Sequence, residues 1–171
     1  MRKYTLYTIW TIALALMMNG CSVSYSLNGA SIDYTRIKTI NITDFQNIAP
    51  IVYPPLAQKL SEDLKDRFQK QTRLTQTTRI GDINIEGEIV GYDLAAEAVQ
   101  ADAYAARTKL TMRVNVRYTN TVDDKESFER EFTSFVSFDS SQMFTNVQDQ
   151  LVEDLTKDII NQIFNATVEN W

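Results

Sequence analysis

The chain has 171 residues, with 17 basic and 22 acidic side chains, a net charge of −5 and no histidine. The acidic balance argues against a nucleic-acid partner, which requires a concentrated basic face. Without histidine the chain lacks the commonest general base and metal ligand, and it has no Gly-rich phosphate loop and no Gly-x-Ser-x-Gly elbow. We therefore predict that the protein is not an enzyme and binds no cofactor.

The N-terminal segment has the features of a lipoprotein signal peptide. A basic start at Arg2 and Lys3 is followed by a mostly apolar run, a small residue at Gly20 and the only cysteine, Cys21. This order marks a secretory signal that is removed, and the run is shorter than the ~20 residues that span a bilayer. A cysteine after the small residue is typical of bacterial lipoproteins, which carry acyl chains on it; the alternative is an ordinary cysteine. We predict removal of residues 1–20, lipidation of Cys21, and no thiol left for other chemistry.

The remaining chain is acidic and has the length of one domain. Loss of the signal leaves 15 basic and 22 acidic side chains, a net charge of −7. We predict a tether over residues 21–35 and a single domain over residues 36–171, long enough to bury a core without a disulfide or metal.

The first half of the predicted domain contains a strand, a loop and a helix. Residues 37–45 are rich in β-formers, and residues 47–55 form a loop with three prolines. Residues 55–72 have the spacing of an amphipathic helix that begins at a proline. Its apolar stripe consists of Leu56, Leu60, Leu64 and Phe68.

The second half is predicted to be mostly sheet. Residues 74–80 form a short strand, and residues 83–94, 107–121 and 126–138 alternate between apolar and polar positions, as strands of an antiparallel meander do. Residues 95–106 are alanine-rich and predict a wide turn or a helix-like excursion.

A second amphipathic helix is predicted over residues 141–168. Its stripe consists of Val147, Leu151, Leu155, Ile159 and Ile163. The order β-α-β-β-β-β-α predicts a two-layer α+β domain, in which two amphipathic helices pack on one face of a four- to five-stranded, mostly antiparallel sheet.

Three basic residues, Lys109, Arg113 and Arg117, share the polar face of one predicted strand. They could form a ladder that binds phosphate or carboxylate groups of a lipid head group. The alternative, which we favour, is pairing with acidic residues on the adjacent strands. Those acidic residues are Glu86, Glu88, Glu129 and Glu131.

Several apolar residues are candidates for partner contact. Val90, Tyr92 and Phe135 are predicted to lie on the outward face of the sheet, unless a loop or residues 25–34 cover them. The proline-rich loop either inserts into a partner or packs on the start of the first helix, and the alanine-rich segment is a further exposed candidate. The contact candidates are Ile48, Ile51, Tyr53, Tyr92, Tyr104 and Phe135.

Short patterns along the mature chain resemble the LptE family of lipopolysaccharide-assembly lipoproteins, in the form carried by Bacteroidetes. The first pattern lies shortly after the cysteine, at residues 25–32, and the others lie at residues 38–40, 47–50, 87–92 and 170–171. The resemblance implies an α+β fold and a lipid-anchored, periplasm-facing location on the inner leaflet of the outer membrane. It also implies two partners, the LptD β-barrel, whose lumen the lipoprotein plugs, and lipopolysaccharide.

Two other functions stay open. One is a periplasm-facing lipid-binding lipoprotein, which predicts a cavity between helices and sheet lined by Leu60, Leu64, Phe128 and Phe132. The other is an adaptor lipoprotein of another secretion or transport complex, which would be distinguished by a different partner.

Overall fold

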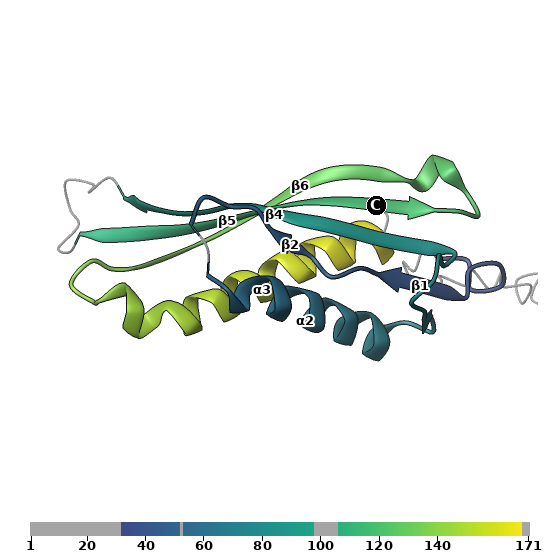
Figure 1. Ribbon diagram of the computed structural model, residues 1–171, viewed down its shortest axis with the longest axis horizontal. Coiled ribbons are helices and arrows are strands. Elements are labelled where there is room, and N and C mark those ends of the chain that lie inside the picture. Colours follow the sequence, from purple (N-terminus) through teal and green to yellow (C-terminus); the bar gives the residue numbers. More distant parts are fainter. Residues whose placement is uncertain (1–31, 52, 98–105, 169–171) are drawn as a thin grey trace, which may run out of the picture.

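The protein is a two-layer α+β domain with two helices on one face of a mixed sheet (Figure 1). The computed structural model describes residues 32–51, 53–97 and 106–168. The helices are α2 (Pro55–Gln71) and α3 (Phe144–Val168), and a short 3₁₀ turn spans Asp124–Glu126. The strands are β1 (Thr39–Ile42), β2 (Gln46–Asn47), β3 (Thr75–Gln76), β4 (Ile83–Ala96), β5 (Arg107–Asn120) and β6 (Phe128–Asp139). The predicted fold class is confirmed.

The strands follow the order β3-β1-β4-β5-β6, and β2 also pairs with β4. As predicted, β4, β5 and β6 form an antiparallel meander. In contrast, β1 is parallel to both β3 and β4. The predicted strand over residues 37–45 is shorter, at β1, and a second short strand, β2, follows it along the same edge of β4, so the sheet has six strands.

The break between β1 and β2 is built around Phe45. Its ring is 4% exposed and lies over Gly87 of β4, where a Cβ atom would come within 2.7 Å of Cδ1 and 2.8 Å of Cζ. The Phe45 N–H donates to Ser61 Oγ on α2 at 2.9 Å, and Ser61 Oγ donates to the Ala57 carbonyl at 2.7 Å. The chain therefore leaves the sheet here without an unpaired buried N–H group.

The core lies between the helices and the inner face of the sheet. The α2 stripe is buried as predicted, and the helix ends where Thr72 becomes extended and bonds the Phe68 carbonyl with its N–H and hydroxyl. The two helices meet at Phe68 and Phe164, whose ring centroids are 5.1 Å apart. The sheet contributes the buried side chains of Ile83, Ile85, Ile89, Leu110, Met112, Val114, Val116 and Phe132.

A β-bulge in β4 changes which side chains face the core. The register runs from Ile89 opposite Val114 directly to Gly91 opposite Arg113, so Val90 is an extra residue. Beyond it the alternation is reversed, and Tyr92 is 1% exposed. The prediction that Tyr92 faces outward is therefore wrong.

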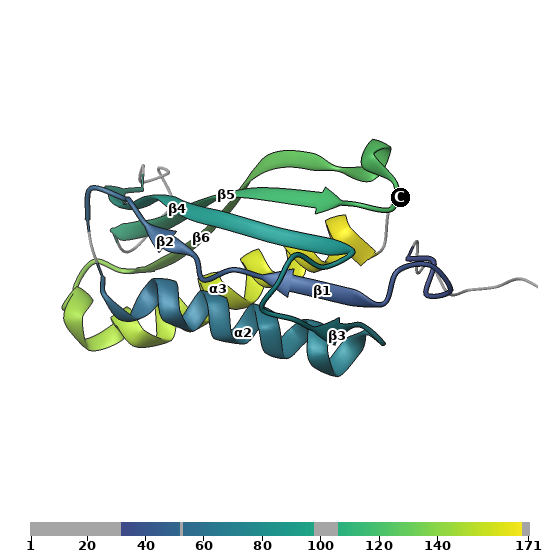
Figure 2. The same cartoon turned by 45° about the vertical axis from the view of Figure 1, so that its right-hand side comes forward.

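The molecule is elongated and has two distinct ends (Figures 1 and 2). At the hairpin end, β4 finishes, β5 begins and α3 starts. At the tether end, residues 32–38 lead into β1, and the last turn of α2 lies close to β3. Residues 32–35 fall within the predicted tether, yet Ile32 is 5% exposed and belongs to the core, so packing extends to Ile32.

Candidate functional site

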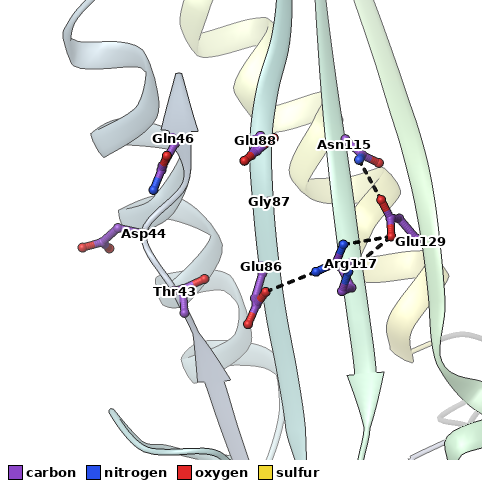
Figure 3. A pocket seen from close by; sticks show the side chains of 9 residues that line it. All are labelled: Thr43, Asp44, Gln46, Glu86, Gly87, Glu88, Asn115, Arg117 and Glu129. Atoms are coloured by element: carbon purple, nitrogen blue, oxygen red, sulfur yellow. Dashed lines mark hydrogen bonds and ion pairs between the residues drawn. The ribbon is translucent and has the colours of Figure 1, made fainter. Parts of the chain in front are cut away.

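The outer face of the sheet, opposite the helices, carries the three basic residues of the predicted ladder. Alternation in β5 places the Lys109, Arg113 and Arg117 side chains on this face. The alternate residues of the strand face the core and are buried: Leu110, Met112, Val114, Val116 and Tyr118. Around Arg117 the face is hollowed over about 310 Å³ (Figure 3). The lining residues are Thr43, Asp44, Gln46, Glu86, Gly87, Glu88, Asn115, Arg117 and Glu129.

Arg117 is neutralised by carboxylates on both neighbouring strands. Its guanidinium lies 3.9 Å from Glu86 Oε2 and 3.2 Å from Glu129 Oε2 (Figure 3). Asn115 also donates to Glu129 at 3.0 Å, and these bonds hold the pKa of Glu129 below its ordinary value. The predicted cross-strand pairing is thus confirmed for Arg117, and the hollow around it is predominantly acidic.

Arg113 is held by a different arrangement. Its guanidinium lies over Gly91, where a Cβ atom would come within 2.5 Å of Nε, and 3.4 Å from Asp93 Oδ2. The bulge turns both Gly91 and Asp93 toward the outer face. This partner is not apparent from the sequence, because a regular alternation places Asp93 on the inner face.

Lys109 lies beside an aromatic ring near the hairpin end. Its ammonium is 5.6 Å from the ring centroid of Phe135, which is 65% exposed, as predicted. A cation over an exposed ring contributes about 0.5–1 kcal/mol. Lys109 makes no ion pair with another described residue, so this position combines a positive charge with an exposed apolar surface.

The loop before α2 exposes two apolar side chains and is held in place by contacts of Tyr53. Ile48 and Ile51 are 56% and 46% exposed. Tyr53 stacks on Tyr92 with centroids 6.5 Å apart and donates to Asp149 of α3, which raises the pKa of the Tyr53 phenol. Tyr53 thus anchors the loop to β4 and α3, and this fixes the position of the loop that carries the two exposed isoleucines.

Most exposed large apolar residues lie outside the tether end, from the middle of the molecule to the hairpin end. Ile48 and Ile51 precede α2, Leu94 and Phe135 lie toward the ends of β4 and β6, and Met143 precedes α3. Among the described residues only one other large apolar side chain, Ile80, is exposed, and it lies at the tether end. Tyr104 lies outside the described residues.

The lipid-binding alternative required an internal cavity between helices and sheet. Leu60, Leu64 and Phe132 are instead at most 5% exposed and belong to one packed core, with Phe128 against its edge. The hollows around Arg117, Asp44 and Lys59 are half-open to solvent and lined mainly by polar residues. This packing argues against an enclosed lipid site.

Two further findings concern metals and membranes. Over residues 32–51, 53–97 and 106–168, no three His, Cys, Asp or Glu side chains are grouped as metal ligands. Within the same residues, neither helix has the length and apolar character to cross a bilayer.

Comparison with known proteins gives a family match. The model of the LptE lipopolysaccharide-assembly family matches residues 37–167. No curated protein matches the chain.

Two solved structures, with TM-scores of 0.50, share the fold at low sequence identity, and a third has a lower score. Hypothetical protein CT253 from Chlamydia trachomatis is 10% identical with a TM-score of 0.50, over 77% of this chain and 98% of that one. Protein XCC0632 from Xanthomonas campestris is 15% identical with a TM-score of 0.50, over 75% and 84%. A minor lipoprotein from Acinetobacter baumannii is 13% identical with a TM-score of 0.47, over 77% and 96%.

Proposed function

Since the chain belongs to the LptE family of lipopolysaccharide-assembly proteins, we propose that it is an outer-membrane lipoprotein that plugs and stabilises an LptD-type β-barrel. It acts by shape complementarity and tethering, with no catalytic step. Acyl chains on Cys21 confine the domain to the inner leaflet on the periplasmic side. Confinement raises its effective concentration near the barrel without any new contact.

The observation that carries this proposal is the pair of exposed isoleucines, Ile48 and Ile51, on the loop before α2. Exposed apolar groups that gather on one surface mark an interaction site, whereas scattered ones need no explanation. Ile48 and Ile51 suit this role best, because the Tyr53 contacts hold their loop in place and little entropy is lost when it binds. Phe135, exposed on the outer face of β6, and Tyr104 stay separate predicted contacts.

We expect lipopolysaccharide to contact the basic ladder at Lys109, the residue nearest the hairpin end. Lys109 next to Phe135 offers a cation and an apolar surface to a phosphorylated glycolipid. Arg113 and Arg117 are engaged by carboxylates, so a phosphate would have to displace Asp93 or Glu129. We therefore expect Lys109→Gln to weaken binding more than Arg117→Gln.

The test is capture of the barrel by the tagged, lipidated chain from detergent-solubilised outer membranes, measured by quantitative mass spectrometry. A near one-to-one ratio to a large barrel is expected for the wild type. Ile48→Asp/Ile51→Asp is expected to reduce this ratio at least about tenfold, since a central contact contributes more than ~1.4 kcal/mol. Gln71→Asp/Gln150→Asp, at two exposed helix positions, introduces the same charge and is the control that should retain the barrel.

Three results would contradict the proposal: recovery of the chain alone, equal loss with the control variant, or unchanged surface lipopolysaccharide and barrel assembly after gene deletion. Recovery of an unrelated transporter would favour an adaptor role instead. Circular dichroism of each variant verifies that the fold is kept.

A further inference from the structure

The tether end carries a basic corner, which we define as Arg36, Lys38, Arg73 and Arg79. Arg36 and Lys38 lie just before β1, and Arg73 and Arg79 lie on either side of β3. Parallel pairing of Thr39 with Thr75 brings the two segments together. All four side chains are exposed, so the corner presents its charges to solvent.

The cations of the basic corner form no close ion pair with the described residues. None of its four cations forms an ion pair with them, whereas Arg107, Arg113 and Arg117 on the sheet all do. Arg73 lies over the Tyr34 ring at 6.0 Å, and Arg36 donates to the Val122 carbonyl at 3.4 Å.

Two carboxylates lie near the corner, and both are engaged with the backbone. Asp82 accepts from the Lys38 and Thr39 N–H groups at 2.8 and 2.9 Å, and Asp33 accepts from the Thr35 N–H at 3.0 Å. Both stay ionised because these hydrogen bonds lower their pKa values. Arg36 also lies beside the acidic turn at Asp123, Asp124 and Glu126, because it donates to the Val122 carbonyl, so the cations without a described carboxylate partner are Arg73 and Arg79.

An exposed apolar side chain accompanies these charges. Ile80 directly follows Arg79 and is 84% exposed, the largest exposed fraction among the described large apolar residues. It lies in the turn between β3 and β4, outside the core. Cations around a protruding apolar side chain are typical of surfaces that contact lipid head groups and insert into the interface.

The position of the corner along the chain identifies the surface it meets. Only ten residues separate Cys21 from Ile32, whose side chain is buried at this end. A fully extended chain of this length reaches at most about 40 Å. Acyl chains on Cys21 would hold the corner within that distance of their own leaflet, while the hairpin end is a further ~46 Å away along 14-residue strands.

We propose that the basic corner and Ile80 form a second membrane contact, which docks on phospholipid head groups of the leaflet that holds the Cys21 acyl chains. Its placement rests on the lipid anchor of the proposed function, and it does not require the barrel. The two contacts together fix the orientation of the domain, which a flexible tether alone would not do. The contact is electrostatic in part, so it weakens with salt.

The test uses the full lipidated chain with a single reporter thiol. Because Cys21 is acylated, Ile80→Cys supplies the only free thiol for a polarity-sensitive dye. The labelled protein is reconstituted into vesicles of phosphatidylethanolamine and phosphatidylglycerol, with or without brominated acyl chains. The control is the same label at Met143→Cys, which is also exposed but lies at the hairpin end.

We expect brominated lipid to quench the dye at position 80 and not at position 143. Arg73→Gln/Arg79→Gln should reduce this quenching and remove its salt dependence, whereas Lys59→Gln/Lys157→Gln removes the same charge from the helices and should not. Absence of quenching at position 80, equal quenching at both positions, or equal effects of the two charge variants would overturn the proposal. The vesicles contain no barrel, so these outcomes are independent of barrel capture.

Discussion

Gly87→Ala tests the contact that splits the first strand. Gly87 allows the Phe45 ring to lie against the β4 backbone, and an added Cβ would sit 2.7 Å from Cδ1 and 2.8 Å from Cζ. The ring is 4% exposed, so it has little room to move within the core. It can only be displaced toward solvent, which also shifts the segment that leads to Ile48.

The expected loss of stability follows from two energies. Overpacking a well-packed site costs about 1–3 kcal/mol, and full exposure of a phenylalanine side chain costs about 1.5–3 kcal/mol. We expect Gly87→Ala to lower the free energy of unfolding by about 2–3 kcal/mol. For a domain of this length each kcal/mol lowers Tm by ~2–4 °C, so the expected shift is about 4–12 °C.

The assay is thermal and urea unfolding of the detergent-solubilised chain, followed by circular dichroism. Gly91→Ala is the matched control, because the three atoms nearest its added Cβ all belong to the Arg113 side chain, whose exposed guanidinium can move away. We expect Gly91→Ala to change stability by less than about 1 kcal/mol.

Phe45→Leu gives the decisive comparison, since leucine lacks the ring atoms that meet the added Cβ. In this background Gly87→Ala should cost at least about 1 kcal/mol less than in the wild type. Additive effects of the two substitutions, or equal destabilisation by Gly87→Ala and Gly91→Ala, would refute the account of the strand break.

Three further predictions concern single side chains. Ser61→Ala removes the acceptor of the buried Phe45 N–H and should lower the free energy of unfolding in urea by about 1–3 kcal/mol. The control is Ser137→Ala, because the Ser137 hydroxyl bonds to no described residue, and its cost should be far smaller. Equal costs would contradict this role of Ser61. Burial raises the pKa of Tyr118 to about 12, so the folded state retains a proton that the unfolded state loses near pH 10. Stability should therefore fall between pH 10 and about 12, and Tyr118→Phe should flatten that decline; an unchanged slope would exclude Tyr118 as the cause. Hydrogen bonds from the Lys38 and Thr39 N–H groups lower the pKa of Asp82, so Asp82 stabilises the fold above the ordinary carboxyl pKa range, and this stabilisation is lost as pH falls through the lowered pKa. Asp82→Asn should therefore weaken the dependence of unfolding on acid. An acid transition identical to that of the wild type would be inconsistent with this.

The sequence predicted the elements whose pattern repeats without interruption. The α2 stripe and the alternation of β5 each present one continuous apolar face, and both were confirmed with nearly the predicted boundaries. The break after β1 depends instead on Phe45 meeting Gly87, 42 positions away, and the reversal at Tyr92 depends on the bulge at Val90. No local periodicity encodes such contacts.

The candidate site was predictable only in outline. In the sequence Lys109, Arg113 and Arg117 are equivalent cations at four-residue intervals. The structure separates them through cross-strand register, which places Arg117 opposite Glu86 and Glu129 but Arg113 opposite Gly91. Register is set here by the bulge, so the carboxylate that meets each cation could not be derived from spacing alone.

The two ends of the molecule also constrain how the domain can meet a membrane. The ~46 Å length of β4 and β5 exceeds the ~30 Å hydrocarbon core of a bilayer, so a tether end held at the head groups would allow the hairpin end to reach across it. The domain cannot enter lipid unprotected, because β3 and β6 are open edges of the sheet and their unpaired backbone groups would lose water. A hairpin end that crosses the membrane plane must therefore be enclosed by protein. A β-barrel wall meets that requirement, since it has no free edge and keeps a polar interior for the acidic outer face around Arg117.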